Sequence, residues 1–168
     1  WIIRNILDKL SHSAYATAYI KKKCITDNVS PHRNNRYFIC LDLEEFFPSI
    51  SIRRVAKIFS IIGYSDKATS ILAKLCTCNG GLARGSQYYP TFSGSLPQGA
   101  VTSPSLSNAI VAKMDRRIAG YTSRRNIIYT RYADDITLSS NNPKVLSQSL
   151  PRILKIIKSE HFNPNMRK

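Results

Sequence analysis

The sequence predicts a folded domain of the α+β class, in which helices and short strands alternate along the chain. At 168 residues the chain is long enough for one domain with a real core, and 43% of its residues are hydrophobic, which argues against disorder. Runs rich in β-branched and aromatic residues alternate with stretches whose apolar residues recur at helical spacing. Together these observations predict a mixed fold.

The first half of the chain contains one predicted strand and two predicted helices. The segment 37–47, YFICLDLEEFF, starts as a β-rich apolar run. Ser51 is expected to cap a helix that ends at Gly63, and a second helix is expected over 66–78. The segment 79–95 carries four of the seven glycines and has no helical period, so we expect a loop or a hairpin there.

Two further helices are expected in the second half. Ser103 and Pro104 have the pattern of an N-cap and a first helical residue. The residues of this helix expected to face inward are Leu106, Ile110, Met114 and Ile118. The last helical pattern runs through 145–157, and Pro151 is expected to kink or split it.

The stretch RYADDITLSS, 131–140, places two adjacent aspartates inside an apolar run. Two short strands folded about Ala133, Asp134 and Asp135 would explain the pattern, although Asp disfavours strands and neighbouring carboxylates repel. Asp42 lies in the first predicted strand and raises the same difficulty. A divalent cation would compensate, since Mg²⁺ takes oxygen ligands and paired ions serve in-line attack at phosphorus. The alternative is that Asp134 and Asp135 simply form the turn.

The charge balance favours a polyanionic partner. The chain has 25 Lys and Arg against 10 Asp and Glu, a formal net charge of +15. Such a balance favours nucleic acid over acidic metabolites, and a merely solvated basic surface is the alternative. The basic residues occur in clusters: Lys21-Lys22-Lys23, Arg53-Arg54, Arg116-Arg117, Arg124-Arg125 and Arg167-Lys168.

The four cysteines do not have the paired C-x-x-C spacing of a zinc site, and nothing resembles a secretory leader. We therefore expect reduced thiols in a cytoplasmic protein. No run reaches the roughly 18–20 apolar residues of a membrane span, so no membrane partner is expected. The chain begins at Trp1 and stops at Lys168 within a motif, and we expect it to be part of a longer polypeptide.

Four ordered motifs resemble those of bacterial retron-type reverse transcriptases. FICLDLEEFFPSI is similar to their A motif, LPQGAVTSP (96–104) to their B motif, and RYADDITLS to the Y-x-D-D hairpin of their C motif. NVSPH (28–32) resembles the retron element Asn-Ala-x-x-His. Val29 and His161 depart from the retron pattern, which usually has Ala and Gly at these positions.

The resemblance implies a right-hand polymerase fold. Its palm, a ferredoxin-like antiparallel sheet with helices on one face, would comprise 36–50 and 95–168. The helices and loop of 51–94 would belong to the fingers, and 1–35 would be the remainder of the fingers. The thumb would lie outside this chain.

The resemblance also implies a catalytic site. Asp42, Asp134 and Asp135 match the family's metal ligands, which implies two Mg²⁺ ions, with Mn²⁺ as a substitute. Lys168 matches a basic residue that protonates the leaving pyrophosphate, a general-acid role. The alternative for Lys168 is an ordinary surface lysine.

Other matched residues would contact substrate or RNA. They are Phe47 as the gate beneath the sugar of the incoming nucleotide, Gln98 and Gly99 beside the nucleotide or template, Tyr132 at the primer end, and Asn28 with His32 in RNA recognition. Alternation along a strand would instead put Phe47 in the core, if the strand continued that far. Strand packing is the alternative for Tyr132, and a satisfied core histidine is the alternative for His32.

These implications lead to one expected function and two alternatives. The expected function is an RNA-directed DNA polymerase of a bacterial retron, which uses deoxynucleoside triphosphates to copy a structured non-coding RNA into DNA joined to that RNA. Its setting would be anti-phage defence, with a defence effector protein as a further partner. The alternatives are a reverse transcriptase of a group II intron or a diversity-generating element, and a catalytically silent RNA-binding scaffold.

Overall fold

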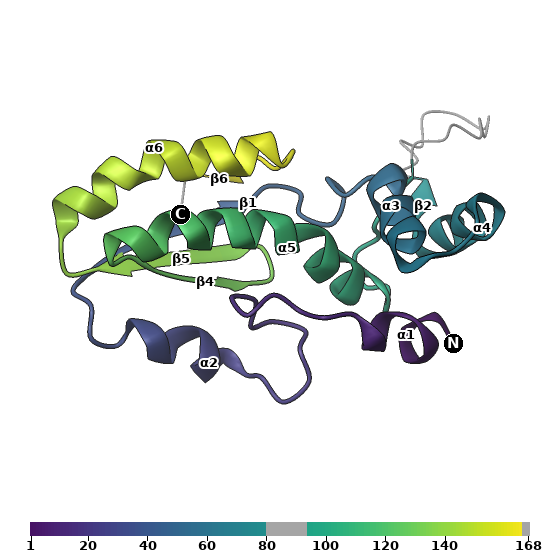
Figure 1. The fold of residues 1–168 in the computed structure, drawn as a ribbon, viewed down its shortest axis with the longest axis horizontal. Helices are drawn as coiled ribbons and strands as arrows, with labels where there is room; N and C mark the ends of the chain where they lie inside the picture. Colours follow the sequence, from purple (N-terminus) through teal and green to yellow (C-terminus); the bar gives the residue numbers. More distant parts are fainter. Residues whose placement is uncertain (80–93, 166–168) are drawn as a thin grey trace. The chain divides into compact units, whose positions relative to one another are not determined.

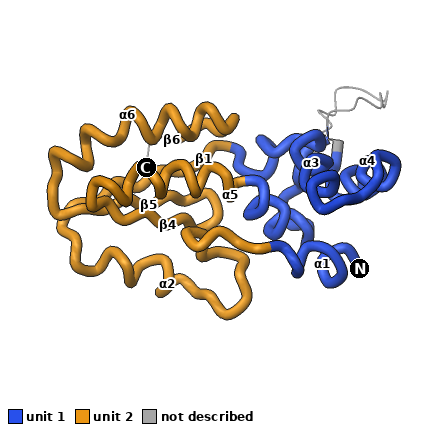
Figure 2. The backbone as a smooth tube through the Cα atoms, viewed as in Figure 1, with its two compact units in different colours: residues 1–10, 45–110 blue, residues 11–44, 111–168 orange. Residues whose placement is uncertain are grey.

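The computed structural model describes residues 1–79 and 94–165. The chain divides into two compact units (Figure 2). Residues 1–10 and 45–110 form what we call the helical unit, and residues 11–44 and 111–168 form the sheet unit. The expectations for 80–93 and for Lys168 fall outside the described residues.

A four-stranded antiparallel sheet organises the sheet unit (Figure 1). Its order is β4-β5-β1-β6, and every neighbouring pair is antiparallel. The strands are β1 (Tyr37–Leu43), β4 (Ile128–Tyr132), β5 (Asp135–Ser140) and β6 (Pro164–Asn165). The predicted hairpin is confirmed as β4 and β5, and the β-rich run predicted at the start of 37–47 is β1, which ends at Leu43. The α+β class is likewise confirmed.

The two faces of this sheet differ in what covers them. Leu41 and Leu43 of β1 are buried, as are Ile136 and Leu138 of β5, on the face covered by α5 (Ser103–Thr122) and α6 (Pro143–Ser159) (Figure 1). Residues one step along each strand point to the opposite face, because side chains alternate. That face stays partly open, and Phe38 on it is 50% exposed.

Short helical turns cover part of the second face. The sequence had predicted helices on one face of the sheet only. These turns are α2 (Ile25–Val29) and η2 (Ser30–His32), and α2 packs against β4.

The two long helices differ in detail from expectation. Helix α5 starts at Ser103 itself, whose hydroxyl donates to the carbonyl of Pro97 at 2.7 Å instead of capping the helix. On its inner face Val111 is fully buried, whereas Ile110 is only half-buried.

Helix α6 runs unbroken through Pro151, so of the predicted kink or split the split is wrong, and the kink stays a prediction. Pro151 lies on the exposed side, where water can satisfy the carbonyl that lacks a helical donor. The helix is capped by Asn142, whose side-chain oxygen accepts from the backbone of Lys144 and Val145.

The helical unit consists mainly of short helices. They are α1 (Ile2–Asn5), η1 (Leu7–Lys9), α3 (Ile52–Ile62) and α4 (Asp66–Cys76). Helix α3 ends as predicted at Gly63, which adopts a φ of 106° that strongly favours glycine. Helix α4 ends two residues before the predicted 78, because Thr77 is already extended.

Two short strands close the helical unit. β2 (Cys78–Asn79) pairs antiparallel with β3 (Gly94–Ser95), so the ends of the predicted loop or hairpin lie side by side. None of the described helices combines the length and the hydropathy that crossing a membrane requires. All four cysteines are free thiols.

Candidate functional site

The end of β1 and the β4–β5 hairpin bring together four of the predicted site residues. The register pairs Leu41 with Ile136, and one further step sets Asp42 opposite Asp135. Tyr132 in turn pairs with Asp135. Opposed residues of antiparallel strands share a face, so Asp42, Asp135 and Tyr132 form a row across three strands on the partly open face.

Asp134 lies next to this row, in the turn. Ala133 and Asp134 form the two-residue connection between β4 and β5. Ala133 has a φ of 55°, a conformation that costs a residue with a Cβ about 1–2 kcal/mol. Asp42 and Asp134 are half-buried and Asp135 is exposed, so this part of the sheet is accessible to solvent.

Tyr19 is a neighbour of the turn that the sequence analysis missed. Burial, then the negative charge of Asp134 and the proximity of Tyr132, raise the pKa of the Tyr19 phenol. The side chain therefore stays protonated beside the carboxylate and can donate a hydrogen bond. Its position depends on a backbone φ of 60°, for which no helix or strand pattern gives a signal.

A buried ion pair supports the hairpin from the face covered by helices. Arg131 and Asp115 are both completely buried, and their side chains form two parallel hydrogen bonds of 2.9 Å. The remaining guanidinium nitrogen donates to the carbonyl of Ala133 at 2.7 Å, and the Tyr129 hydroxyl donates to Asp115 at 2.7 Å. Burial and the adjacent Asp115 raise the pKa of Tyr129 well above its ordinary value, so the phenol remains a donor.

The sequence analysis also missed this ion pair, although a signal was present. Asp115 follows Met114 on the buried side of α5, and Arg131 interrupts an apolar strand. A buried acid and a buried base in neighbouring elements predict a pair, because either charge alone would be costly to bury.

The chain around residue 16 fixes the backbone of Arg131 from the edge of β4. Ala16 forms a parallel bridge with Arg131. The Arg131 amide donates to the Tyr15 carbonyl at 2.8 Å, and the Thr17 amide donates to the Arg131 carbonyl at 2.9 Å. Both backbone polar groups of Arg131 are therefore satisfied.

His32 joins the η2 turn to both strands of the hairpin. It is 2% exposed, with Nδ1 2.6 Å from the Ser139 hydroxyl and Nε2 2.8 Å from the Thr130 hydroxyl. Because Asn35 donates to Ser139 and Thr130 donates to the Asn28 carbonyl, one consistent network results. Ser139 donates to Nδ1, and Nε2 donates to Thr130.

This network requires a neutral imidazole, and burial accordingly lowers the pKa of His32. Asn28 is also buried, and its side-chain oxygen accepts from the Thr17 hydroxyl at 3.1 Å. Both residues predicted to contact RNA thus make interior hydrogen bonds, and for His32 this geometry favours the alternative of a satisfied core histidine.

The residues matched to nucleotide contacts lie in the helical unit. Phe46 is buried and Phe47 is half-buried, with their ring centroids 5.2 Å apart. Since β1 ends at Leu43, the alternation that would put Phe47 in the core does not extend to it. Gln98 and Gly99 are exposed, and Gly99 has a φ of 85°.

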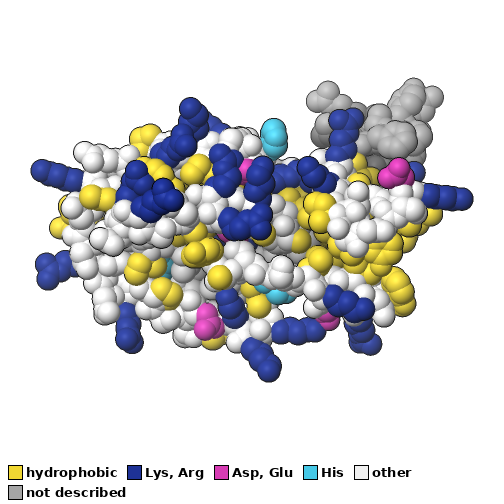
Figure 3. All heavy atoms as spheres, in the orientation of Figure 1, with side chains coloured by type: hydrophobic (Ala, Val, Ile, Leu, Met, Phe, Trp, Pro, Cys, Tyr) yellow, Lys and Arg dark blue, Asp and Glu magenta, His cyan; other side chains and the backbone are white. Residues whose placement is uncertain are grey.

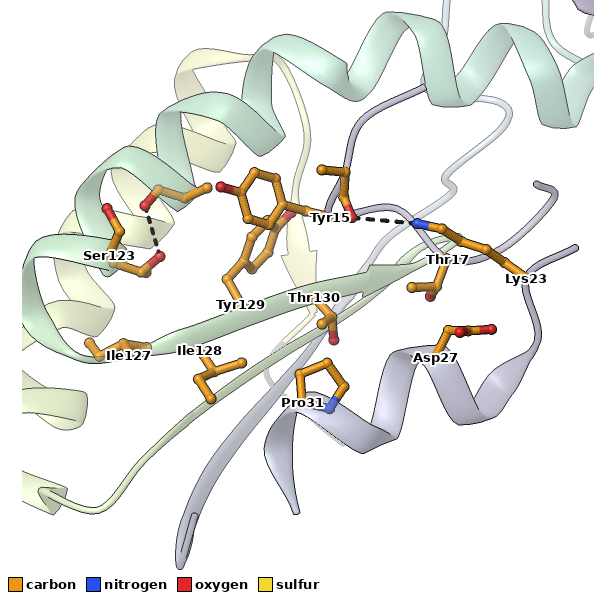
Figure 4. A pocket seen from close by; sticks show the side chains of 13 residues that line it. Tyr15, Thr17, Lys23, Asp27, Pro31, Ser123, Ile127, Ile128, Tyr129 and Thr130 are labelled. Atoms are coloured by element: carbon orange, nitrogen blue, oxygen red, sulfur yellow. Dashed lines mark hydrogen bonds between the residues drawn. The ribbon is translucent and has the colours of Figure 1, made fainter. Parts of the chain in front are cut away.

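A pocket of about 410 Å³ lies in the sheet unit among α2, β4 and the end of α5 (Figure 4). Its lining includes Tyr15, Lys23, Asp27, Ser123 and Tyr129. The ammonium group of Lys23 donates to the Ala16 carbonyl at 2.9 Å, which fixes the segment that pairs with Arg131.

Exposed basic residues continue from two edges of this pocket. Lys21 and Lys22 precede Lys23, and Arg124 with Arg125 follows Ser123. Lys and Arg side chains far outnumber Asp and Glu on the surface seen in Figure 3. The surface therefore favours negatively charged ligands.

Comparison with known proteins gives consistent matches over the chain. The family described as reverse transcriptase (RNA-dependent DNA polymerase) matches residues 2–168. The chain is 39% identical over 168 residues to the retron Ec86 reverse transcriptase of Escherichia coli, across 100% of this chain and 48% of that protein.

Two other relatives come from different retrons. The retron Mx65 reverse transcriptase of Myxococcus xanthus is 32% identical over 171 residues, with 97% of this chain and 39% of the relative covered. The retron Ec83 reverse transcriptase of Escherichia coli is 31% identical over 151 residues, with coverages of 86% and 46%. The chain thus spans about half the length of these relatives, or somewhat less.

The His32 network predicts a specific loss of stability in mild acid. The pKa of His32 is lower in the folded state than in the unfolded state, so the unfolded state takes up a proton first as the pH falls. The free energy of unfolding should therefore decrease below a pH of about 6.5. In His32→Gln this part of the pH dependence should be absent, and stability at pH 8 should drop by about 1–3 kcal/mol.

Urea unfolding between pH 8 and pH 5.5 measures both effects. His12→Gln is the matched control, because His12 is exposed, and it should follow the wild-type pH dependence. A His32→Gln variant that loses stability in acid as steeply as the wild type would contradict the assignment.

Proposed function

The chain belongs to the reverse transcriptase (RNA-dependent DNA polymerase) family, and from this premise we propose that the aspartates at the hairpin are the catalytic centre of an RNA-directed DNA polymerase. The observation that carries the proposal is the row of Asp42, Asp135 and Tyr132, with Asp134 beside it in the turn. The residues come from two segments far apart in sequence that match the A and C motifs.

The donor set fits a divalent cation whose ligands come partly from substrate. Asp42 and Asp135 are like charges on directly opposed strand positions, an arrangement that destabilises a sheet unless a cation balances it. Within 1–79 and 94–165, no group of three His, Cys, Asp or Glu side chains is arranged to hold a metal ion. Mg²⁺ usually takes one or two protein carboxylates and completes its shell with water and substrate phosphates.

We accordingly assign Asp42, Asp134 and Asp135 as ligands of two Mg²⁺ ions, with Mn²⁺ as a substitute. When bound, the ions stabilise the negative charge that develops at the phosphorus centre. The hairpin carries Asp134 in its two-residue turn and Asp135 at the start of β5, and Tyr132 shares a face with Asp135 and Asp42. In this proposal Tyr132 contacts the primer end.

The other roles in this proposal belong to the helical unit and to Lys168. Phe47 is the gate against a ribose 2′-hydroxyl, and Gln98 and Gly99 border the nucleotide or template. Lys168 is the general acid for the leaving pyrophosphate. The sheet unit corresponds to most of the palm, and α3 and α4 correspond to the fingers.

For the partner, we propose a structured non-coding RNA of a retron, copied into DNA joined to it. The retron relatives support this choice over an intron or diversity-generating enzyme, and the presence of all three aspartates argues against a silent scaffold. RNA contact is assigned to the exposed lysines and arginines, because Asn28 and His32 are buried. The proposal extends to a cytoplasmic setting, where thiols stay reduced, and to anti-phage defence with an effector protein.

Substituting a proposed ligand separates chemistry from binding. Asp134→Asn and Asp42→Asn in the full-length protein should each lower the rate of magnesium-dependent primer extension by more than about 100-fold. RNA affinity should remain close to wild type, since basic residues supply it. Asp8→Asn, at an exposed acid of the helical unit, is the control and should keep the wild-type rate. Substantial extension by either ligand variant would refute the assignment.

The basic residues beside the pocket should contribute to RNA affinity through counterion release. Affinity for an RNA hairpin should fall steeply between low and physiological salt. Lys21→Gln with Lys22→Gln should make the slope of log affinity against log salt shallower by roughly 1.4–1.8, about 0.7–0.9 for each lost phosphate contact. Lys21→Arg with Lys22→Arg retains the charge and should retain the slope. An unchanged slope in the glutamine variant would exclude these lysines as phosphate contacts.

The gate proposal distinguishes two adjacent phenylalanines. Phe47→Ala should retain DNA synthesis but incorporate ribonucleotides far more readily, because the barrier that it removes is steric. Phe46→Ala should mainly lower stability, by about 3–5 kcal/mol, since Phe46 is 4% exposed. Single-nucleotide incorporation assays with matched ribo- and deoxynucleotides give the ratio. If Phe46→Ala changes the ratio and Phe47→Ala does not, the gate is misassigned.

A further inference from the structure

We propose that Arg131, held by Asp115, is a positioning residue that sets the β4–β5 turn and with it the placement of Asp134 and Asp135. The inference rests on the proposed catalytic role of those two carboxylates. It concerns a pair of residues that lies outside the row of Asp42, Asp135 and Tyr132.

One guanidinium group makes two different connections. Nε and Nη2 of Arg131 donate to the two oxygens of Asp115 at 2.9 Å each. Nη1 donates to the carbonyl of Ala133 at 2.7 Å. The guanidinium group is planar and rigid, so Asp115 on α5, by binding two of its nitrogens, also fixes the position of the third. The hydrogen bond from that third nitrogen therefore holds the Ala133 carbonyl at a fixed position relative to α5.

Burial excludes a direct role of Arg131 in substrate binding. Arg131 and Asp115 have no exposed surface, and they lie on the face of the sheet that the helices cover. Tyr132 and Asp135 point to the other face. Arg131 can therefore influence the carboxylates only through the backbone of the turn.

The turn needs such support because its backbone is unfavourable for an alanine. Ala133 has a φ of 55°, and strained conformations persist at functional sites only where surrounding contacts enforce them. The hydrogen bond from Arg131 reaches the carbonyl of this residue, directly before Asp134.

The anchor itself is immobilised at three points. The Arg131 amide donates to Tyr15, its carbonyl accepts from Thr17, and Asp115 holds its side chain. A buried ion pair is seldom more stabilising than apolar residues of similar volume, which favours a role in conformational specificity. Tyr129 donates to Asp115 and also interacts with the Arg131 guanidinium, so Tyr129→Phe removes one contact of the pair while the Ala133 carbonyl keeps its donor.

The decisive variant removes both charges together. Arg131→Met with Asp115→Leu, in the full-length protein, replaces the pair by apolar side chains and should leave the protein folded. Its unfolding midpoint should fall, because the Tyr129 hydroxyl and the Ala133 carbonyl each lose a hydrogen-bond partner. The rate constant kcat for nucleotide incorporation should fall about 10- to 100-fold, because small displacements of reacting groups have effects of that size. The KM for the nucleotide and the affinity for RNA should change by less than about twofold, since neither residue reaches the surface.

A second measurement does not depend on activity. Hydrogen exchange of the metal-free protein should be faster than wild type in the peptide that spans 132–136, and unchanged elsewhere. Tyr129→Phe keeps the bonds of Arg131 to Asp115 and to Ala133, so kcat and hairpin exchange should change much less than in the double variant. A double variant that folds with wild-type kcat and wild-type hairpin exchange would overturn the inference.

Arg131→Lys keeps the positive charge but lacks the planar guanidinium that binds Asp115 and Ala133 at the same time. If the double variant fails to fold, this variant tests whether Arg131 positions the turn. It should lower kcat and accelerate hairpin exchange, whereas wild-type values for both would overturn the inference. If the wild-type protein itself makes no DNA, the proposed function fails, and exchange in the hairpin still tests whether Arg131 sets the turn.

Discussion

The buried ion pair between Arg131 and Asp115 is the interaction on which the geometry of the hairpin depends. It joins helix α5 to strand β4 and, through the carbonyl of Ala133, to the turn. The two buried charges are tolerated because Arg131 and Asp115 pair with good hydrogen-bond geometry. The Tyr129 hydroxyl donates a further hydrogen bond to the Asp115 carboxylate. With its anchor in the interior, the turn holds a backbone conformation that Ala133 would not adopt by itself.

The opposite face uses neutral groups for the same purpose. His32 bridges Thr130 on β4 and Ser139 on β5, and its pKa is lowered by burial, so this support carries no charge at neutral pH. The hairpin is thus held from both faces by interior side chains, while Asp135 at its end is exposed. This separation lets reactive carboxylates remain accessible on a rigid support, as a polymerase centre of the proposed kind requires.

Local sequence signals predicted the helices and strands well where neighbouring residues alone determine where an element begins or ends. Gly63 ends α3 because few other residues adopt its backbone conformation, and the paired aspartates predicted a hairpin because Asp favours turns. Pro151 does not split α6, since an exposed proline removes one hydrogen bond that water replaces, and the helix continues. The β-rich run that starts the segment 37–47 forms a strand as far as Leu43, where no local pattern distinguishes the last strand residue from the following turn.

By itself the sequence determined the α+β class, the strongly basic surface, and the identity of the aspartates that gather at the hairpin, because these follow from composition and short motifs. Only the tertiary structure decided what holds those aspartates. His32 and Ser139 are separated by 107 residues, and Asp115 and Arg131 by 16 with the end of a helix between them. Such partners are selected by packing between elements, so only the structure shows that His32 and Asn28 are buried, and their role in RNA recognition stays a prediction. Propensity and periodicity describe each segment alone, whereas hydrogen bonds in the interior depend on which segments meet.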